Sequence, residues 1–161
     1  MIAPFVVLLL AACGSSGGSN STTQQQQRLT PALYRAQIAK IKREAAQAQS
    51  DVSQGLGAKN VSDLKQKIDD FASATQRIGD EVAALNPPQN AAAANAQLAQ
   101  GLQDIAAGTR AASSKIANLK SVGAAIAYLE HSKGPAKGSR EVSKALATLQ
   151  KLGYTTDAVQ P

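Results

Sequence analysis

Hydrophobic residues recur every three or four positions along most of the chain after residue 30, which is the spacing of one face of an α-helix. The first such segment begins at Thr30, a good N-cap, and Pro31, a residue suited to the first helical position. Gly55 and Gly57 end it. The hydrophobic positions of this predicted helix are Tyr34, Ile38, Ile41, Ala45, Ala48 and Val52.

The second segment has the most regular pattern and predicts a strongly amphipathic helix. Ser62 is its predicted N-cap, and the helix is expected to stop at Asn86, because a residue that precedes a proline avoids the helical region. All but one of its seven inward positions are apolar. These positions are Leu64, Ile68, Phe71, Thr75, Ile78, Val82 and Leu85.

The third segment runs from Pro88 to Ser132 without a further proline until Pro135. Unbroken, it would be about 67 Å long at 1.5 Å per residue, against about 36 Å for each helix before it. We therefore expect it to bend, near residues 108–114 or at Gly123, or to overhang its neighbours. Its inward positions are Leu98, Leu102, Ile105, Thr109, Ala112, Ile116, Leu119, Gly123 and Ile126.

A shorter last helix is predicted from Ser139, its N-cap, to Gly153, which stands where a C-cap glycine belongs. Short connections make neighbouring helices antiparallel. The chain therefore predicts an all-α fold, an antiparallel helical bundle of three long helices and a shorter C-terminal helix over residues 30–154, with a tail at 155–161. The inward positions of the last helix are Val142, Leu146, Leu149 and Leu152.

Small residues are expected to bring these helices close together. Alanine supplies 32 of the 161 residues, with only five aromatic residues and no Trp, and alanine is the best helix former. Gly101 and Gly108, seven positions apart, predict a close approach to a neighbouring backbone. The alternative for this strip is a groove that admits a ligand or a partner helix.

The apolar run Ile2 to Ala12 ends in Leu10-Ala11-Ala12-Cys13. Its eleven residues are too few to cross a bilayer, which takes about 20, but they fit the hydrophobic segment of a secretory signal. The tetrapeptide resembles the lipobox of bacterial lipoproteins. That resemblance implies that residues 1–12 are a cleaved signal peptide and that Cys13 becomes the lipidated N-terminus. An ordinary cleaved signal and a buried N-terminal segment are the alternatives.

The chain after Cys13 is polar and of low complexity. Residues 14–27 carry no charge and no large apolar side chain, so they cannot bury enough surface to offset their ordering entropy. We interpret residues 13–29 as the lipidated Cys and a flexible Ser/Gly/Gln tether, whose residues 14–27 reach roughly 20 Å. The implied location is the extracytoplasmic face of a cell membrane.

A second, looser resemblance concerns the helical part. The stretch from Leu85-Asn86-Pro87-Pro88 through the alanine run to Leu98-Ala99-Gln100-Gly101-Leu102 is similar to a recurrent pattern in small actinobacterial helical lipoproteins. The ending Leu149-Gln150-Lys151-Leu152-Gly153-Tyr154 is similar to theirs as well. This resemblance covers about a third of the chain and implies a fold and a location, with no catalytic residues.

The formal charge of +6 is unevenly distributed: residues 28–51 and 133–157 each carry five basic and two acidic side chains. Such an excess favours contact with anionic lipid or wall polymer, and the alternative is a solvated basic surface. Nucleic acid is not expected as a partner of an exported protein. The candidate contact residues are Lys133, Lys137, Arg140, Lys144 and Lys151.

The residues that usually carry catalysis are sparse. His131 is the single histidine, and no Glu-x-x-His motif occurs. In the acidic pairs 69–70 and 80–81, adjacent helical side chains point about 100° apart, which favours a solvated edge over a paired-carboxylate site. We expect no enzyme, no metal and no cofactor other than the covalent lipid on Cys13, such as palmitate.

These observations predict a lipid-anchored cell-envelope protein that acts as a non-enzymatic binding or structural module. Its partners would be the membrane, through the anchor, and an anionic envelope polymer or another envelope protein. The alternative is a small-molecule carrier or sensor that holds an apolar ligand between its helices.

Overall fold

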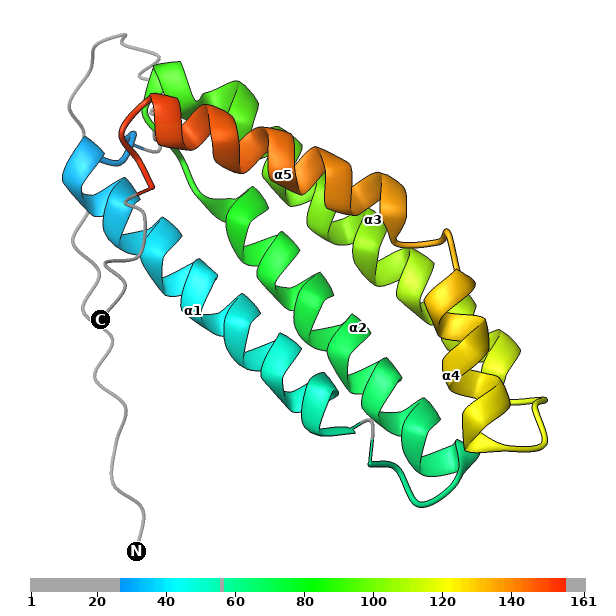
Figure 1. The fold of residues 1–161 in the computed structure, drawn as a ribbon. Coiled ribbons are helices and arrows are strands. Elements are labelled where there is room, and N and C mark those ends of the chain that lie inside the picture. The colour runs from blue at the N-terminus through cyan, green and yellow to red at the C-terminus, as the bar shows by residue number, and fades with distance from the viewer. Residues whose placement is uncertain (1–26, 56, 156–161) are drawn as a thin grey trace, which may run out of the picture.

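The computed structural model describes residues 27–55 and 57–155, and this part of the chain is an all-α helical bundle, as the sequence predicts (Figure 1). Five α-helices and one short 3₁₀ turn follow one another. Their bounds are α1 Pro31–Gly55, α2 Val61–Ala84, the 3₁₀ turn η1 Gln89–Ala91, α3 Ala92–Ile116, α4 Val122–His131 and α5 Ala136–Lys151.

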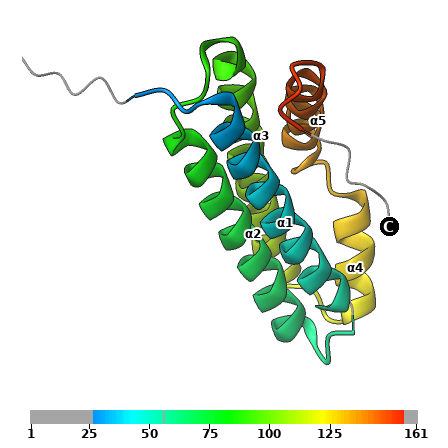
Figure 2. The ribbon, with the colours of Figure 1, turned by 90° about the vertical axis from the view of Figure 1, so that its left-hand side faces the viewer.

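The helices α1, α2 and α3 run antiparallel in succession, and α5 lies along α3 (Figures 1 and 2). The most extensive interface joins α2 to α3, followed by α3 with α5, while α1 packs mainly on α2. The short α4 contacts the ends of α2 and α3. One end of the bundle therefore holds the start of α1, the α2–α3 turn and the end of α5.

The third predicted helix is in fact two helices. It ends at Ile116, and the break falls at residues 117–121, between the two places where a bend was expected. The Oγ of Ser121 accepts a hydrogen bond from the Ala124 N–H at 3.2 Å and so caps a new helix. The break turns α4 back onto the bundle, where Ala125 is buried beside Leu64.

Two predicted helix ends are confirmed. The Oγ1 of Thr30 accepts from the Leu33 N–H at 3.3 Å at the start of α1. After α5, Gly153 has a φ of 74°, the left-handed conformation that favours glycine. The Tyr154 N–H then donates to the carbonyl of Leu149 at 2.8 Å, which closes a Schellman motif and turns the Tyr154 side chain into the core.

Two predicted N-caps were wrong. Asn60, two residues before Ser62, caps α2, because its side-chain oxygen accepts from the Asp63 N–H at 2.9 Å. The last helix begins at Ala136, so Ser139 lies inside it, where its hydroxyl donates to the Pro135 carbonyl at 3.0 Å.

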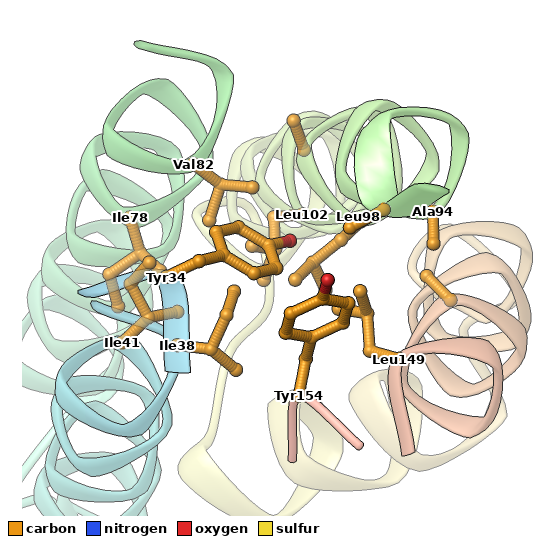
Figure 3. Packing of buried hydrophobic residues seen from close by; sticks show 13 residues of the cluster. Tyr34, Ile38, Ile41, Ile78, Val82, Ala94, Leu98, Leu102, Leu149 and Tyr154 are labelled. Atoms are coloured by element: carbon orange, nitrogen blue, oxygen red, sulfur yellow. The ribbon is translucent and has the colours of Figure 1, made fainter. Parts of the chain in front are cut away.

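The core has two parts. The larger joins α1, α2, α3 and α5 around the edge-to-face pair Tyr34 and Tyr154, whose ring centroids are 5.1 Å apart (Figure 3). The smaller lies at the opposite end, around Leu64, Ile68, Ile116 and Ala125. The predicted inward positions are buried or partly buried, with two exceptions: Gly123 is exposed, and Leu152 keeps 36% of its surface exposed.

The glycines of α3 do mark a close approach to a neighbouring backbone. A Cβ on Gly101 would lie 2.9 Å from the Val142 nitrogen, and one on Gly108 would collide with the Gly134 backbone. A Cβ on Gly138 would lie 2.5 Å from the Gly101 carbonyl oxygen. Because α5 and the turn before it cover this strip, it is not an open groove.

The folded part begins slightly before the predicted boundary at residue 30. The Leu29 N–H donates to the Asn86 carbonyl at 2.7 Å, and Arg28 Nη1 donates to the Pro87 carbonyl at 3.1 Å. The Leu29 side chain packs against the larger core. Residues 28 and 29 therefore belong to the bundle and join the start of α1 to the α2–α3 turn.

Candidate functional site

The predicted lipidation site, Cys13, lies outside the described residues, as do the signal segment and nearly all of the tether. The first described residue, Gln27, leads into the end of the bundle where α1 begins and α5 ends (Figure 1). No helix in the described ranges 27–55 and 57–155 has the length and apolar character needed to cross a membrane.

The structure brings four of the five candidate basic residues onto one face of α5. Lys137, Arg140, Lys144 and Lys151 follow one another at intervals of three, four and seven, which places them within an arc of about 60°. All four are exposed. The buried residues of α5 lie on another side, facing α3; they are Gly138, Ala145 and Leu149. We call these four basic residues the α5 stripe.

Two members of the α5 stripe are paired with acids. Lys137 Nζ lies 2.9 Å from Asp104 Oδ2, and this ion pair is the main cause that lowers the pKa of Asp104. Lys144 Nζ lies 3.2 Å from Glu141 Oε1. Glu141 also accepts from the Gln97 amide at 2.6 Å, and that bond, followed by Lys144, lowers the pKa of Glu141. Both acids therefore stay ionised and offset part of the lysine charge.

The remaining candidates differ in their surroundings. Arg140 and Lys151 form no ion pair within residues 27–55 and 57–155. Lys133 is exposed in the turn before α5, so it precedes the stripe instead of belonging to it. The unpaired positive charge of the stripe is therefore concentrated at Arg140 and Lys151.

A shallow groove of about 220 Å³ lies between α1 and the chain that follows α5. Its bases are Arg35, Lys42 and Arg43, and its apolar floor includes Ile38 and Tyr154. Arg35 Nε donates to the Gly153 carbonyl at 2.8 Å and closes one end. The sequence analysis missed this groove. The intervals between residues 35, 38, 42 and 43 signal one helix face, but nothing local shows that residue 154 faces it.

Hydrogen bonds join the two core tyrosines to asparagines of α3 and of the turn before it. The Tyr34 hydroxyl donates to Asn95 Oδ1 at 3.0 Å, and Asn95 Nδ2 donates to the Val82 carbonyl at 2.9 Å. The Tyr154 hydroxyl donates to Asn90 Oδ1 at 2.8 Å. Burial raises the pKa of Tyr34 above its ordinary value of 10.0, which keeps the hydroxyl protonated as a donor. This network fixes the helices and offers no free group for chemistry.

The remaining titratable residues have surface positions. His131 is exposed in the last turn of α4, where a cation is favoured by the helix dipole. Asp69 accepts from Lys65 Nζ and from Ser113 Oγ, both at 2.5 Å, and these two bonds lower its pKa. Across the described part of the chain, no three His, Cys, Asp or Glu side chains gather as metal ligands.

Comparison of the chain with models of known protein families, with curated proteins and with solved structures finds no match.

Proposed function

We propose that this protein is a lipid-anchored, non-enzymatic module of the bacterial cell envelope that binds an anionic envelope polymer through the α5 stripe. The observation that carries this proposal is the alignment of Lys137, Arg140, Lys144 and Lys151 on an exposed face of α5. The lipobox-like ending at Cys13 supports the anchor.

The stripe has the form that an extended polyanion requires. From Lys137 to Lys151 the helix rises over 14 positions, which is about 21 Å at 1.5 Å per residue. A flexible polymer with one phosphate per repeat can place successive phosphates along such a line. A basic side chain near an anionic surface contributes about 1 kcal/mol, so several together give a measurable, salt-sensitive affinity.

Two observations favour surface binding over the alternative of a small-molecule carrier. The Gly101 and Gly108 strip, where a ligand could have lodged between helices, is filled by α5. Three hollows on the described residues, of about 220, 400 and 410 Å³, are open to solvent and not enclosed between helices, whereas ligand pockets bury most of the ligand surface.

The test is binding of poly(glycerol phosphate) to the chain from Gly14 onward, which contains every residue of both core clusters. Neutralising the unpaired members of the stripe, Arg140→Gln with Lys151→Gln, is expected to weaken binding about thirtyfold at low ionic strength, since two contacts of about 1 kcal/mol each are lost. Isothermal titration calorimetry at several salt concentrations measures the affinity.

The matched control is Lys115→Gln with Lys120→Gln, which removes the same charge from two exposed lysines at the other end of the bundle. The control variant should keep its affinity within about twofold. Equal loss in the two variants would show that net charge alone acts, and no binding at low ionic strength would remove the polymer as a partner.

A further inference from the structure

One end of the bundle is built from three stretches that are distant in sequence: residues 27–36, 82–95 and 146–155 (Figure 1). Hydrogen bonds join them. The first stretch meets the second through Leu29 N–H and the Asn86 carbonyl, and meets the third through Arg35 Nε and the Gly153 carbonyl. We call this region the tether end, because the described chain starts there.

The charge of the tether end has one sign. Its three stretches contain Arg28, Arg35 and Lys151 and no Asp or Glu. The opposite end, residues 51–66 and 112–134, mixes five lysines with three acids, which are Asp51, Asp63 and Glu130. The tether end therefore carries three positive charges and no negative one, which complements an anionic surface, while the opposite end has a net charge of +2 with both signs mixed.

The tether end also exposes apolar side chains. Leu33 in the first turn of α1 keeps 55% of its surface exposed, and Leu152 just after α5 keeps 36%. In the described part of the chain one other large hydrophobic residue is exposed, Tyr128 at 40%, and it lies in α4, toward the opposite end. Leucine side chains next to basic ones form the combination that enters the headgroup region of a bilayer.

The geometry points to an anionic membrane surface as the partner of the tether end, with Leu33 and Leu152 entering the headgroup layer and Arg28, Arg35 and Lys151 facing lipid phosphates. The inference rests on the proposed anchor at Cys13. The reach of residues 14–27, roughly 20 Å, holds this end of the bundle closest to the bilayer. The α5 stripe, which starts at Lys151, then leads away from the membrane.

The first experiment supplies the anchor artificially, so that its result does not depend on Cys13. The chain from Gly14, with an N-terminal histidine tag, is held on vesicles that contain a small fraction of nickel-chelating lipid. An environment-sensitive fluorophore is placed at Leu33→Cys or, as the matched control, at Tyr128→Cys. We expect the emission at position 33 to shift to the blue on phosphatidylglycerol-containing vesicles and not on phosphatidylcholine alone, while position 128 is unchanged on both.

The second experiment measures partition of the untagged chain from Gly14 onto phosphatidylglycerol-containing vesicles by co-sedimentation. Leu33→Ser with Leu152→Ser is expected to weaken partition by about tenfold or more, because two inserted leucines are lost. Tyr128→Ser should leave it unchanged. The inference would be overturned if the fluorophore at position 33 showed no emission shift, or if the shifts at positions 33 and 128 were equal. Unchanged partition of the Leu33→Ser, Leu152→Ser variant would also overturn it. Failure of the anchor itself is seen separately, in the mass of the mature N-terminus.

Discussion

Replacing Gly138 with alanine is expected to lower the free energy of unfolding by about 3 kcal/mol, in the upper range for overpacking a filled interface. The added Cβ would lie 2.5 Å from the Gly101 carbonyl oxygen and 2.6 Å from the Ile105 nitrogen. Both are backbone atoms of α3, so relief requires moving α5 as a whole. Urea denaturation of the chain from Gly14, followed by far-ultraviolet circular dichroism, measures the loss.

The matched control for Gly138→Ala is Gly123→Ala in α4. A Cβ on Gly123 would meet nothing within 4 Å, so the only effect is the better helix propensity of alanine, a gain of about 0.5–1 kcal/mol. Opposite signs for the two substitutions would establish that backbone contact, and not helix propensity, governs α5. A small or absent loss at Gly138 would contradict the close packing of α3 on α5.

Asn95→Ala is expected to destabilise the bundle by about 2 kcal/mol, because it leaves a buried hydroxyl without an acceptor and removes one donor from a buried carbonyl. The Tyr34 hydroxyl loses its acceptor, while the Val82 carbonyl loses one of two donors and keeps the Leu85 N–H at 3.2 Å. Neither can turn to solvent, since Tyr34 and Val82 are fully buried. The same denaturation measurement gives the change.

Asn90→Ala is the counterpart at the surface. Asn90 also accepts from a tyrosine hydroxyl, that of Tyr154, but Asn90 is exposed and water can replace it. The expected loss is about 0.5 kcal/mol. Similar losses at positions 95 and 90 would show that burial does not set the value of this network.

The helical content and the inward faces followed from the sequence because they depend on local spacing. Residues such as Ile38, Ile78 and Leu149 are buried where a helical repeat places them. The same reasoning failed at Leu152, which follows the last residue of α5 and keeps 36% of its surface exposed. Periodicity tells which residues share a face, but only the neighbouring helices decide how far along that face is covered.

The exact position of the break between α3 and α4 was not predicted, because packing between residues distant in sequence decides it. Ser121 can cap a helix or lie within one, and the choice depends on whether residues 122–131 gain contacts by folding back. They do so through Ala125, which reaches Leu64 and Ile116 of the smaller core. The N-cap of α2 is Asn60 and not Ser62 for a similar reason. Both residue types can cap a helix, and the position of the preceding turn decides which of them does.

The candidate site was predicted in part. The spacing of Lys137, Arg140, Lys144 and Lys151 is enough to place them on one helix face. The residues that offset this charge could not be predicted in the same way, because they come from a distant part of the chain. Asp104, which pairs with Lys137, and Gln97, which binds Glu141, both lie in α3. The groove at Arg35 and the tether end likewise require residues from opposite ends of the chain to meet.

The proposed anchor, the tether end and the α5 stripe form one arrangement. A lipid on Cys13 would bring the basic end of the bundle to the bilayer, and the stripe on α5 would then extend from Lys151 toward the polymer outside. In this proposal each part makes a separate physical contribution, since the anchor would give permanent attachment, the tether end orientation and the stripe selective contact. All of it depends on the modification of one cysteine.

The most direct test is intact-protein mass spectrometry of the mature chain recovered from membranes of a bacterial host. The account predicts that residues 1–12 are absent and that Cys13 is the first residue, carrying a diacylglyceryl thioether. A Cys13→Ser variant should give no acylated form. Mature protein that begins at another residue, or that carries an unmodified Cys13, would contradict the account.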